Sequence, residues 1–210
     1  RSDEVSYMID DIPVNDAYGG VAAVSTLEVE SVKDLEVITG TFNAEYGNAM
    51  SGVVNAVTKD GSNEFHGSLN SAYSTYITDN KRNGEKVYIG LDPFGINSNS
   101  DFRFNLSGPI IKDRLYFFSN FRTQGINGHL NGIRRFNVWN LSNFYDQDSS
   151  KWYSENTGDS AFVPMNKGNY SSLMGKVSLD LGNLRLSWML NNNYSQSRGY
   201  SHVYKYNPDG

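Results

Sequence analysis

The sequence predicts a compact α/β or β segment followed by long antiparallel β-strands of the kind that cross a membrane as a barrel. Up to about Lys59 the chain is rich in small residues and interrupted by glycines. From Phe65 onward apolar and polar residues alternate, which is the period of a strand with two different faces. No apolar run reaches the roughly 18 residues that a transmembrane helix needs, so any crossing of a membrane is expected to use strands.

The composition fits such strands better than an ordinary soluble domain. Only 38% of the 210 residues are hydrophobic, which is low for a chain that must bury a large core. In a membrane barrel half of each strand faces a polar lumen, and this accounts for the low figure. The net charge of -5 gives no basic field for nucleic acid, and the lack of cysteine excludes disulfides and thiolate metal sites.

Short elements are expected in the first region. In chain order they are a strand over Val5–Ile9, one helical turn over Val29–Asp34, a strand over Glu36–Thr39 and a strand over Val53–Thr58. The turn-forming pair Asp10–Asp11 ends the first strand, and Gly40 ends the third. Gly52 stands at the entrance of the last strand.

Five longer strands are expected in the second region. They cover Phe65–Ser74, Phe102–Ile110, Leu115–Gln124, Ser172–Leu181 and Leu184–Asn193. Each is close to the roughly 9–11 residues that a tilted strand needs to cross the hydrocarbon. Apolar residues such as Leu69, Leu106 and Leu186 mark one face, although Tyr116 and Phe118 blur the alternation in the third strand.

The connections between these strands alternate between short turns and long loops. Lys112–Arg114 joins the second strand to the third, and the hairpin pair Gly182–Asn183 joins the fourth to the fifth. The other two connections, 78–100 and 125–168, are long. Membrane barrels segregate their loops in this way, with short turns at the periplasmic end and long loops outside the cell.

Seven short motifs stand out along the chain: Met8–Pro13, Leu35–Val37, Ala44–Gly47, Ser51–Asn55, Val57–Lys59, Gly61–Gly67 and Ser107–Phe118. Together they resemble the end of the plug and the start of the barrel in TonB-dependent outer-membrane receptors and transporters, and the last of them resembles the Oar-like branch. The resemblance implies a plug of mixed α/β fold and a transmembrane barrel of about 22 strands. It divides the chain into residues 1–62, the C-terminal part of the plug, and 63–210, the first five or so barrel strands with extracellular loops 78–100 and 125–168.

The resemblance also implies energy-coupled uptake of a bulky ligand into the periplasm by a multi-pass protein of the Gram-negative outer membrane. Its partners would be an unknown extracellular ligand, outer-membrane lipid and TonB, which would bind a segment upstream of Arg1. A related branch would add a surface lipoprotein. No nucleic acid, cofactor, metal or catalytic group is expected, because no hydrolase, phosphate-binding or metal-ligand motif is present.

Three groups of candidate site residues follow from the resemblance and the alternation. The plug motif, with a structural or gating role, contains Glu36, Gly40, Glu45, Tyr46, Gly47, Gly52, Asn55 and Thr58. Basic residues expected to face the lumen, and to pair with plug acids such as Glu36 and Glu45, are Arg103, Arg122, Lys176 and Arg185. Trp139, Trp152 and Tyr153 are candidates for ligand contact in the second long loop, or for packing that loop on itself.

One departure from the family pattern and several alternatives remain at this stage. Many family members carry a basic residue just before the glycine found here as Gly40, whereas this chain has Thr39. The same barrel would also suit an outer-membrane adhesin or assembly component, and a soluble extracellular carbohydrate-binding β-domain is a third alternative. A passive porin would have no plug, so the segment Met8–Lys59 argues against it.

Overall fold

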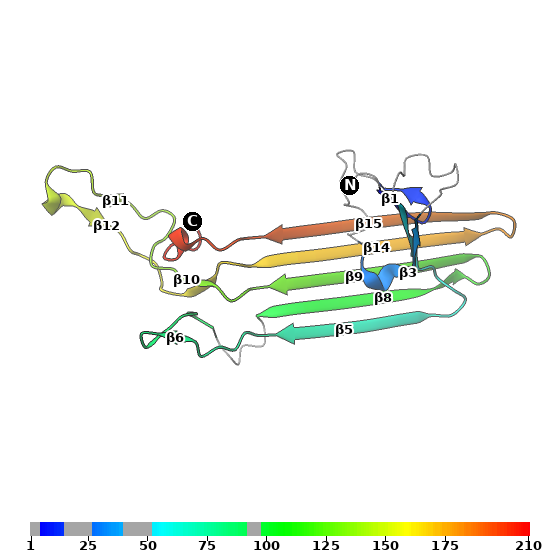
Figure 1. Cartoon of the computed structure of the whole chain (residues 1–210), viewed down its shortest axis with the longest axis horizontal. Helices are drawn as coiled ribbons and strands as arrows, with labels where there is room; N and C mark the ends of the chain where they lie inside the picture. The colour runs from blue at the N-terminus through cyan, green and yellow to red at the C-terminus, as the bar shows by residue number, and fades with distance from the viewer. Residues whose placement is uncertain (1–4, 15–26, 40–51, 92–97) are drawn as a thin grey trace. The chain divides into compact units, whose positions relative to one another are not determined.

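A computed structural model describes residues 5–14, 27–39, 52–91 and 98–210 (Figure 1). The chain divides into two compact units. The first contains residues 1–70, 103–122 and 172–193, and the second contains residues 71–102, 123–171 and 194–210. The described residues form strands, turns and short 3-10 helices but no α-helix, so the helical part of the expected α/β segment is not found among them. No helix of the described residues is long and apolar enough to cross a membrane.

A small four-stranded sheet in the first unit contains the N-terminal elements. Its strands lie in the order β2-β1-β4-β3, where β1 is Val5–Ile9, β2 is Ile12–Pro13, β3 is Val32–Ile38 and β4 is Gly52–Thr58. Strand β4 pairs parallel with β1 and antiparallel with β3. It is the central strand, which explains why Val53 and Ala56 are fully buried.

The helical turn expected over Val29–Asp34 is shorter than predicted. A 3-10 helix covers only Val29–Ser31, and β3 begins directly at Val32. The hydroxyl of buried Ser31 donates to the Glu28 carbonyl at 2.6 Å, and the Ser31 carbonyl accepts from the Lys59 amide at 2.8 Å. Pairing with β4 then favours extended backbone in place of a second turn, so β3 starts four residues before the strand expected at Glu36.

The five long strands expected from the alternation are confirmed. They form one sheet in the order β15-β14-β9-β8-β5, where β5 is His66–Ser74, β8 is Asn99–Ile111, β9 is Leu115–Ile126, β14 is Gly168–Asp180 and β15 is Arg185–Ser197. The arrows of successive strands alternate in direction (Figure 1). Sheet order therefore follows chain order, as in an up-and-down antiparallel sheet.

The two short turns also form as predicted. The Leu181 amide donates to the Leu184 carbonyl at 2.9 Å and closes a two-residue hairpin over Gly182–Asn183. Gly182 has a φ of +84° at the first central position, where a type II′ turn requires a positive value. In the turn between β8 and β9, Asp113 has a φ of +61° and accepts from Asn63 at 2.6 Å.

Alternate residues of β14 lie on two very different faces. Met174 and Lys176 are buried, with 2% and 6% of their surfaces exposed. Leu173, the neighbour of Met174 in the same strand, is 44% exposed. Leu186 and Trp188 of β15 are also exposed, on the face that the sequence assigns to apolar residues. Phe118, which interrupts the predicted alternation of β9, is only 4% exposed. By alternation Phe118 lies on the same face of β9 as Arg122. Because this face is covered at Phe118, an apolar residue is tolerated at a position where the alternation calls for a polar one.

The long loops contain short elements of their own. In the second unit these are β6 (Lys81–Arg82), β7 (Glu85–Lys86), β10 (Asn131–Ile133), β11 (Ser142–Asn143), η3 (Ser149–Lys151), β12 (Tyr153–Ser154) and β13 (Phe162–Pro164), and a further 3-10 helix, η4 (His202–Tyr204), follows β15. The pairs β6–β7, β10–β13 and β11–β12 are antiparallel. The loops are therefore structured segments closed by their own hydrogen bonds.

Candidate functional site

The turn between β1 and β2 places Asp10 at the end of the small sheet, within reach of the long sheet. Asp10 and Asp11 have φ values of +48° and +66°, a left-handed pair that Asp and Asn tolerate better than most residues. Buried Asn55 donates to the Asp11 carboxylate at 2.7 Å and accepts from the Asp11 amide at 3.2 Å. The Thr58 amide and hydroxyl both donate to the Asp10 carboxylate, at 2.8 and 2.6 Å. Two residues of β4 thus fix the turn.

Lys176 of β14 reaches this turn from the long sheet. Its ammonium donates to Asp10 Oδ2 and to Thr58 Oγ1, each at 2.9 Å, and lies 3.1 Å from Asp60 Oδ1. Only 6% of the Lys176 side chain is exposed. A lysine is rarely buried unless it is paired, so the two carboxylates and the hydroxyl account for the burial of this lysine.

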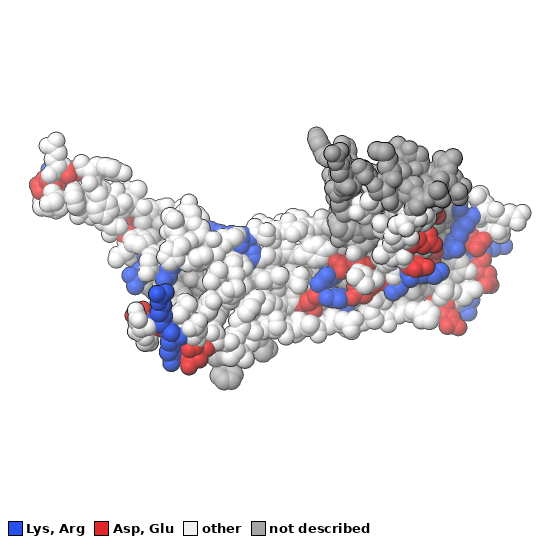
Figure 2. Space-filling view, in the orientation of Figure 1, with Lys and Arg blue, Asp and Glu red and all other residues white. Residues whose placement is uncertain are grey.

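Asp60 extends the contact to a neighbouring strand. It accepts from the Ser178 hydroxyl at 2.8 Å and from the Arg185 guanidinium of β15 at 3.0 Å. We call Asp10, Thr58, Asp60, Lys176, Ser178 and Arg185 the junction cluster. The cluster joins the small sheet to two strands of the long sheet, and Figure 2 shows basic and acidic side chains side by side in this unit.

Two more ion pairs attach the segment before β3 to the long sheet. Arg122 of β9 donates to Glu28 at 3.1 Å, and Glu28 is 8% exposed. Arg103 of β8 donates to Glu30 at 2.7 Å. With the junction cluster, these pairs connect the N-terminal residues to four of the five long strands, β8, β9, β14 and β15.

Hydrogen bonding keeps two of these carboxylates ionised. Burial acts to raise the pKa of Asp10, but the hydrogen bonds from Thr58 and Lys176 outweigh it, and its pKa lies below the ordinary value. Burial also acts to raise the pKa of Glu30, and the hydrogen bond from Arg103 reverses the direction. Both groups are therefore anionic at neutral pH, as an ion pair requires.

Acid is expected to weaken the junction through Asp10. A carboxylate whose pKa is lowered by folding contributes stability above its unfolded pKa and loses it as the pH falls through the folded value. Protection of the β1 and β4 amides from hydrogen exchange, corrected for intrinsic rates, should therefore fall from about pH 5 downward. Asp10→Asn, which tolerates the same backbone, should remove most of this dependence. An unchanged acid profile in Asp10→Asn would show that another group controls the junction.

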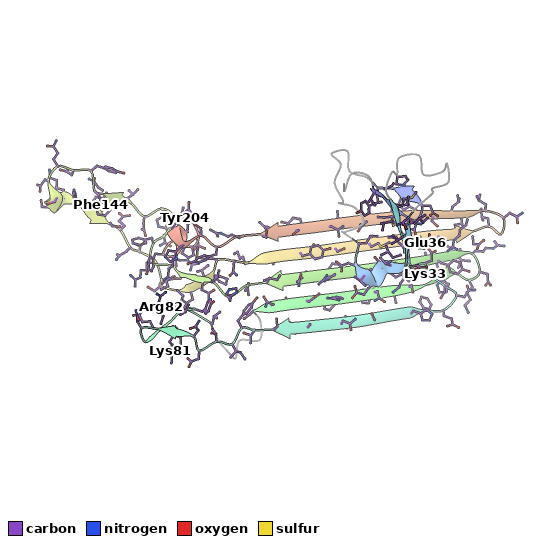
Figure 3. The ribbon with its side chains drawn as sticks, viewed as in Figure 1. Lys33, Glu36, Lys81, Arg82, Phe144 and Tyr204 are labelled. Carbon is purple, nitrogen blue, oxygen red and sulfur yellow. The ribbon has the colours of Figure 1, made fainter. Side chains whose placement is uncertain are left out.

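The structure brings together all four predicted basic residues with acids, but the acids differ from those expected. The carboxylates are Asp10, Glu28, Glu30 and Asp60. Glu36 is exposed on β3 (Figure 3) and forms no ion pair with the described residues. Glu45 lies outside the described residues, so its expected pairing is not addressed. Whether the four basic residues face a lumen stays a prediction.

The other plug-motif residues are divided between the described and the remaining parts of the chain. Asn55 and Thr58 hold the Asp10–Asp11 turn, and Gly52 begins β4 in a buried position. Gly40, Tyr46 and Gly47 lie outside the described residues. The sequence gives only weak signals for two of the acids that were not predicted as partners. Asp10 stands in a turn-forming pair, and Asp60 follows the end of a predicted strand.

The three loop aromatics, Trp139, Trp152 and Tyr153, all lie in the second unit. The Trp152 indole donates to the Asp146 carbonyl at 2.9 Å, and its ring centre lies 6.1 Å from that of Phe144 (Figure 3). Tyr153 pairs with Asn143 across β11 and β12. Trp139 is 74% exposed. Trp152 and Tyr153 thus help to fold the loop on itself, and their role in ligand contact stays a prediction.

Within the described ranges, no three His, Asp or Glu side chains are grouped so that they could hold a metal ion. The chemistry of the junction is therefore that of ion pairs and hydrogen bonds between two structural parts. These contacts hold the small sheet against the long sheet.

Comparison with known proteins agrees with this organisation. Residues 1–53 match the model of the TonB-dependent receptor plug domain. Over 122 residues the chain is 40% identical to the TonB-dependent transporter Oar of Myxococcus xanthus, a match that covers 57% of this chain and 11% of that protein. Over 89 residues it is 37% identical to the probable TonB-dependent siderophore receptor PirA of Acinetobacter baumannii, covering 42% of this chain and 10% of that protein.

Among solved structures, the crystal structure of the siderophore receptor PirA from Acinetobacter baumannii resembles this chain with a TM-score of 0.49 and 18% sequence identity. The superposition covers 91% of this chain and 24% of that one. The chain thus spans about a tenth of the length of the relatives matched by sequence and about a quarter of the solved structure.

The N-terminal segment has a plug signature and is attached through its acids to the basic face of an antiparallel sheet, an arrangement that fits an outer-membrane receptor. The sequence matches are specific within that class. Residues 1–53 carry the plug-domain signature of TonB-dependent receptors, and the chain is similar to the Oar transporter. The family resides in the outer membrane, and both relatives matched by sequence are named as a transporter or a receptor rather than an enzyme.

Proposed function

We propose that this chain forms the end of the plug and the start of the barrel of a transporter that takes up a bulky ligand with energy from TonB. Residues 1–62 belong to the plug and residues 63–210 to multi-pass barrel strands, in a barrel of about 22 strands. The loops 78–100 and 125–168 lie outside the cell, where they meet the ligand. The chain carries out no chemical step on it.

The observation that supports this proposal best is the burial of Lys176 among plug acids. Apolar contacts between plug and barrel would resist separation in water, because each exposed Å² would cost about 25 cal/mol. Ion pairs and hydrogen bonds such as Lys176–Asp10 are different, since both partners are rehydrated when they part. A polar junction therefore suits a plug that must stay in place at rest and be rearranged during uptake.

The proposed partners follow from the same arrangement. TonB would engage the plug, and outer-membrane lipid would cover the apolar face that carries Leu186 and Trp188. A surface lipoprotein would belong only to the alternative branch of the family. Trp139, Trp152 and Tyr153 are offered as ligand contacts in the second long loop. The adhesin and carbohydrate-binding alternatives are not favoured by the comparisons.

Uptake in the presence and absence of TonB tests the proposal. Cells of the source species with and without the full-length receptor would be grown on limiting iron chelates, oligosaccharides, peptides or cobalamin, each as the sole source of its nutrient. At least one nutrient should require both the receptor and TonB for growth. Growth that needs the receptor but is unaffected by deletion of TonB would contradict an energy-coupled transporter.

Charge substitutions on the two faces of the long sheet should differ in their effects. Leu106→Arg or Leu179→Arg would place a charge on the face assigned to lipid, at a cost of about 2–4 kcal/mol near the midplane. Both should impair membrane assembly, measured by the heat-modifiable gel shift of a folded barrel. Asn105→Arg, on the opposite face, should assemble better. Equal assembly of the three variants would contradict the assigned facing.

A further inference from the structure

A pocket in the second unit contains a histidine between two tyrosines. The His129 ring centre lies 5.2 Å from that of Tyr76 and 5.5 Å from that of Tyr88. The pocket has a volume of about 250 Å³ and is also lined by Ile77, Thr78 and Leu91. Five of its six lining residues come from the region of the first long loop, whereas His129 comes from the second. The histidine therefore completes a pocket that neither loop forms alone.

Contacts between the two loops hold this arrangement. The Asn131 side chain, which is 9% exposed, donates to the Ile89 carbonyl at 2.9 Å. The Asn127 amide donates to the Ser98 carbonyl at 2.7 Å. These two bonds lie on either side of His129 in the chain and attach the second loop to residues of the first.

The backbone around His129 is fixed as well. Gly128 has a φ of +70°, and a side chain there would collide with Asn166. Asn166 accepts from the Leu130 amide at 2.9 Å. Gly128 and Leu130, the residues before and after His129, thus both contact Asn166. These contacts fix the backbone that carries the imidazole.

We propose that this pocket is a subsite for an uncharged aromatic ring carried by a larger ligand. The inference deepens the proposed function, on which it rests for the presence of such a ligand. Aromatic pairs stabilise by about 0.5–1.5 kcal/mol beyond the area that they bury. The tilted rings of Tyr76, Tyr88 and His129 offer edges and faces to an incoming ring, with Ile77 and Leu91 completing an apolar surface.

The size and charge of the pocket narrow the ligand class. A cavity of about 150 Å³ lined by apolar residues admits benzene, whereas pockets for whole drug-sized ligands have volumes of about 300–1,000 Å³. At about 250 Å³ the pocket has room for one or two fused rings. Among the described residues no acid, lysine or arginine lines it. It therefore accepts a neutral ring and offers the Thr78 hydroxyl as a polar contact at its edge.

Binding of a simple probe to the purified full-length receptor tests this subsite without TonB. The probe is N-acetyl-L-tyrosinamide, and its binding is followed by saturation-transfer NMR titration. N-acetyl-L-alaninamide, which lacks the aromatic ring, is titrated in the same way as the control. Wild-type receptor should saturate the ring protons of the first probe and show no saturable signal with the second. Ile77→Asp, which adds a charge at a 78% exposed position, should weaken binding about tenfold, equivalent to about 1.4 kcal/mol.

A matched variant distinguishes binding in the pocket from nonspecific binding of the probe to the loops. Tyr145→Ala removes a 96% exposed aromatic residue of the second loop outside the pocket, and it should leave probe binding unchanged. The gel shift confirms that each variant is folded. No saturable binding, or equal binding by wild type and Ile77→Asp, would overturn the subsite. Probe binding without TonB-dependent growth would support the subsite and contradict the transporter, so the two proposals fail separately.

Discussion

Lys176→Met is expected to loosen the attachment of the plug to the long sheet. The substitution keeps most of the side-chain length but removes the cation that lies 2.9 Å from Asp10 and 3.1 Å from Asp60. Removing one partner of a fully buried pair costs about 3–5 kcal/mol, because the other charge is left uncompensated. Here Asp10 and Asp60 remain 25% and 31% exposed. A loss of about 2–3 kcal/mol is therefore expected.

A cysteine placed in the small sheet can report this loosening. Ser6 lies in β1 with 8% of its surface exposed, and this chain contains no cysteine of its own. The rate at which Ser6→Cys reacts with a maleimide measures how often β1 opens, provided that closing is faster than reaction. A loss of about 2–3 kcal/mol in Lys176→Met would raise that rate roughly 30- to 140-fold, since about 1.4 kcal/mol corresponds to tenfold.

Lys33→Met provides the matched control. Lys33 is exposed on β3 of the same small sheet (Figure 3). Exposed charges contribute about 0–1 kcal/mol at most, so labelling of Ser6→Cys should change little. If Lys176→Met and Lys33→Met had the same labelling rate, the junction cluster would not be what holds β1 in place.

The strands were predictable because their pattern is local. Alternation along Ser172–Leu181 requires only that the two faces of a strand meet different surroundings, and β14 shows that difference from residue to residue. The hairpin at Gly182–Asn183 was predictable for the same reason, since the residue types at the turn fix its geometry. In the first region the strand pairing was harder to predict. Its central strand β4 is buried on both faces, so it carries no alternation that would reveal its partners.

The partners of the basic residues were not predictable from local pattern. Lys176 and Asp10 are 166 residues apart in the chain, and only the folded sheet brings them together. Glu36 lay in a family motif and was expected to pair, but β3 pairs with β4 in a register that leaves Glu36 exposed opposite Asn55. His129 stands in no sequence motif, and its two tyrosine neighbours, Tyr76 and Tyr88, come from the region of the other long loop.

Gly61→Ala is expected to disrupt the connection between the plug and the first strand. A Cβ atom at Gly61 would lie 2.8 Å from the Phe117 nitrogen and 2.9 Å from the Gly108 oxygen, and closer still to the Phe117 oxygen. All three are backbone atoms of β8 and β9, which cannot move aside as a flexible side chain would. Overpacking of this kind costs about 1–3 kcal/mol, occasionally more. Movement of Gly61 would also displace Asp60 from Arg185 and Ser178.

Gly175→Ala tests whether the effect belongs to this close approach or to glycine in general. Gly175 lies in β14, and a Cβ atom there would meet nothing within 4 Å. The Gly175→Ala protein should assemble normally and leave Ser6→Cys labelling unchanged. Gly61→Ala should raise the labelling rate roughly 5- to 140-fold for a cost of about 1–3 kcal/mol. Equal behaviour of the two variants would mean that the plug connection can shift away from β8 and β9, and that the contact at Gly61 does not fix the position of Asp60.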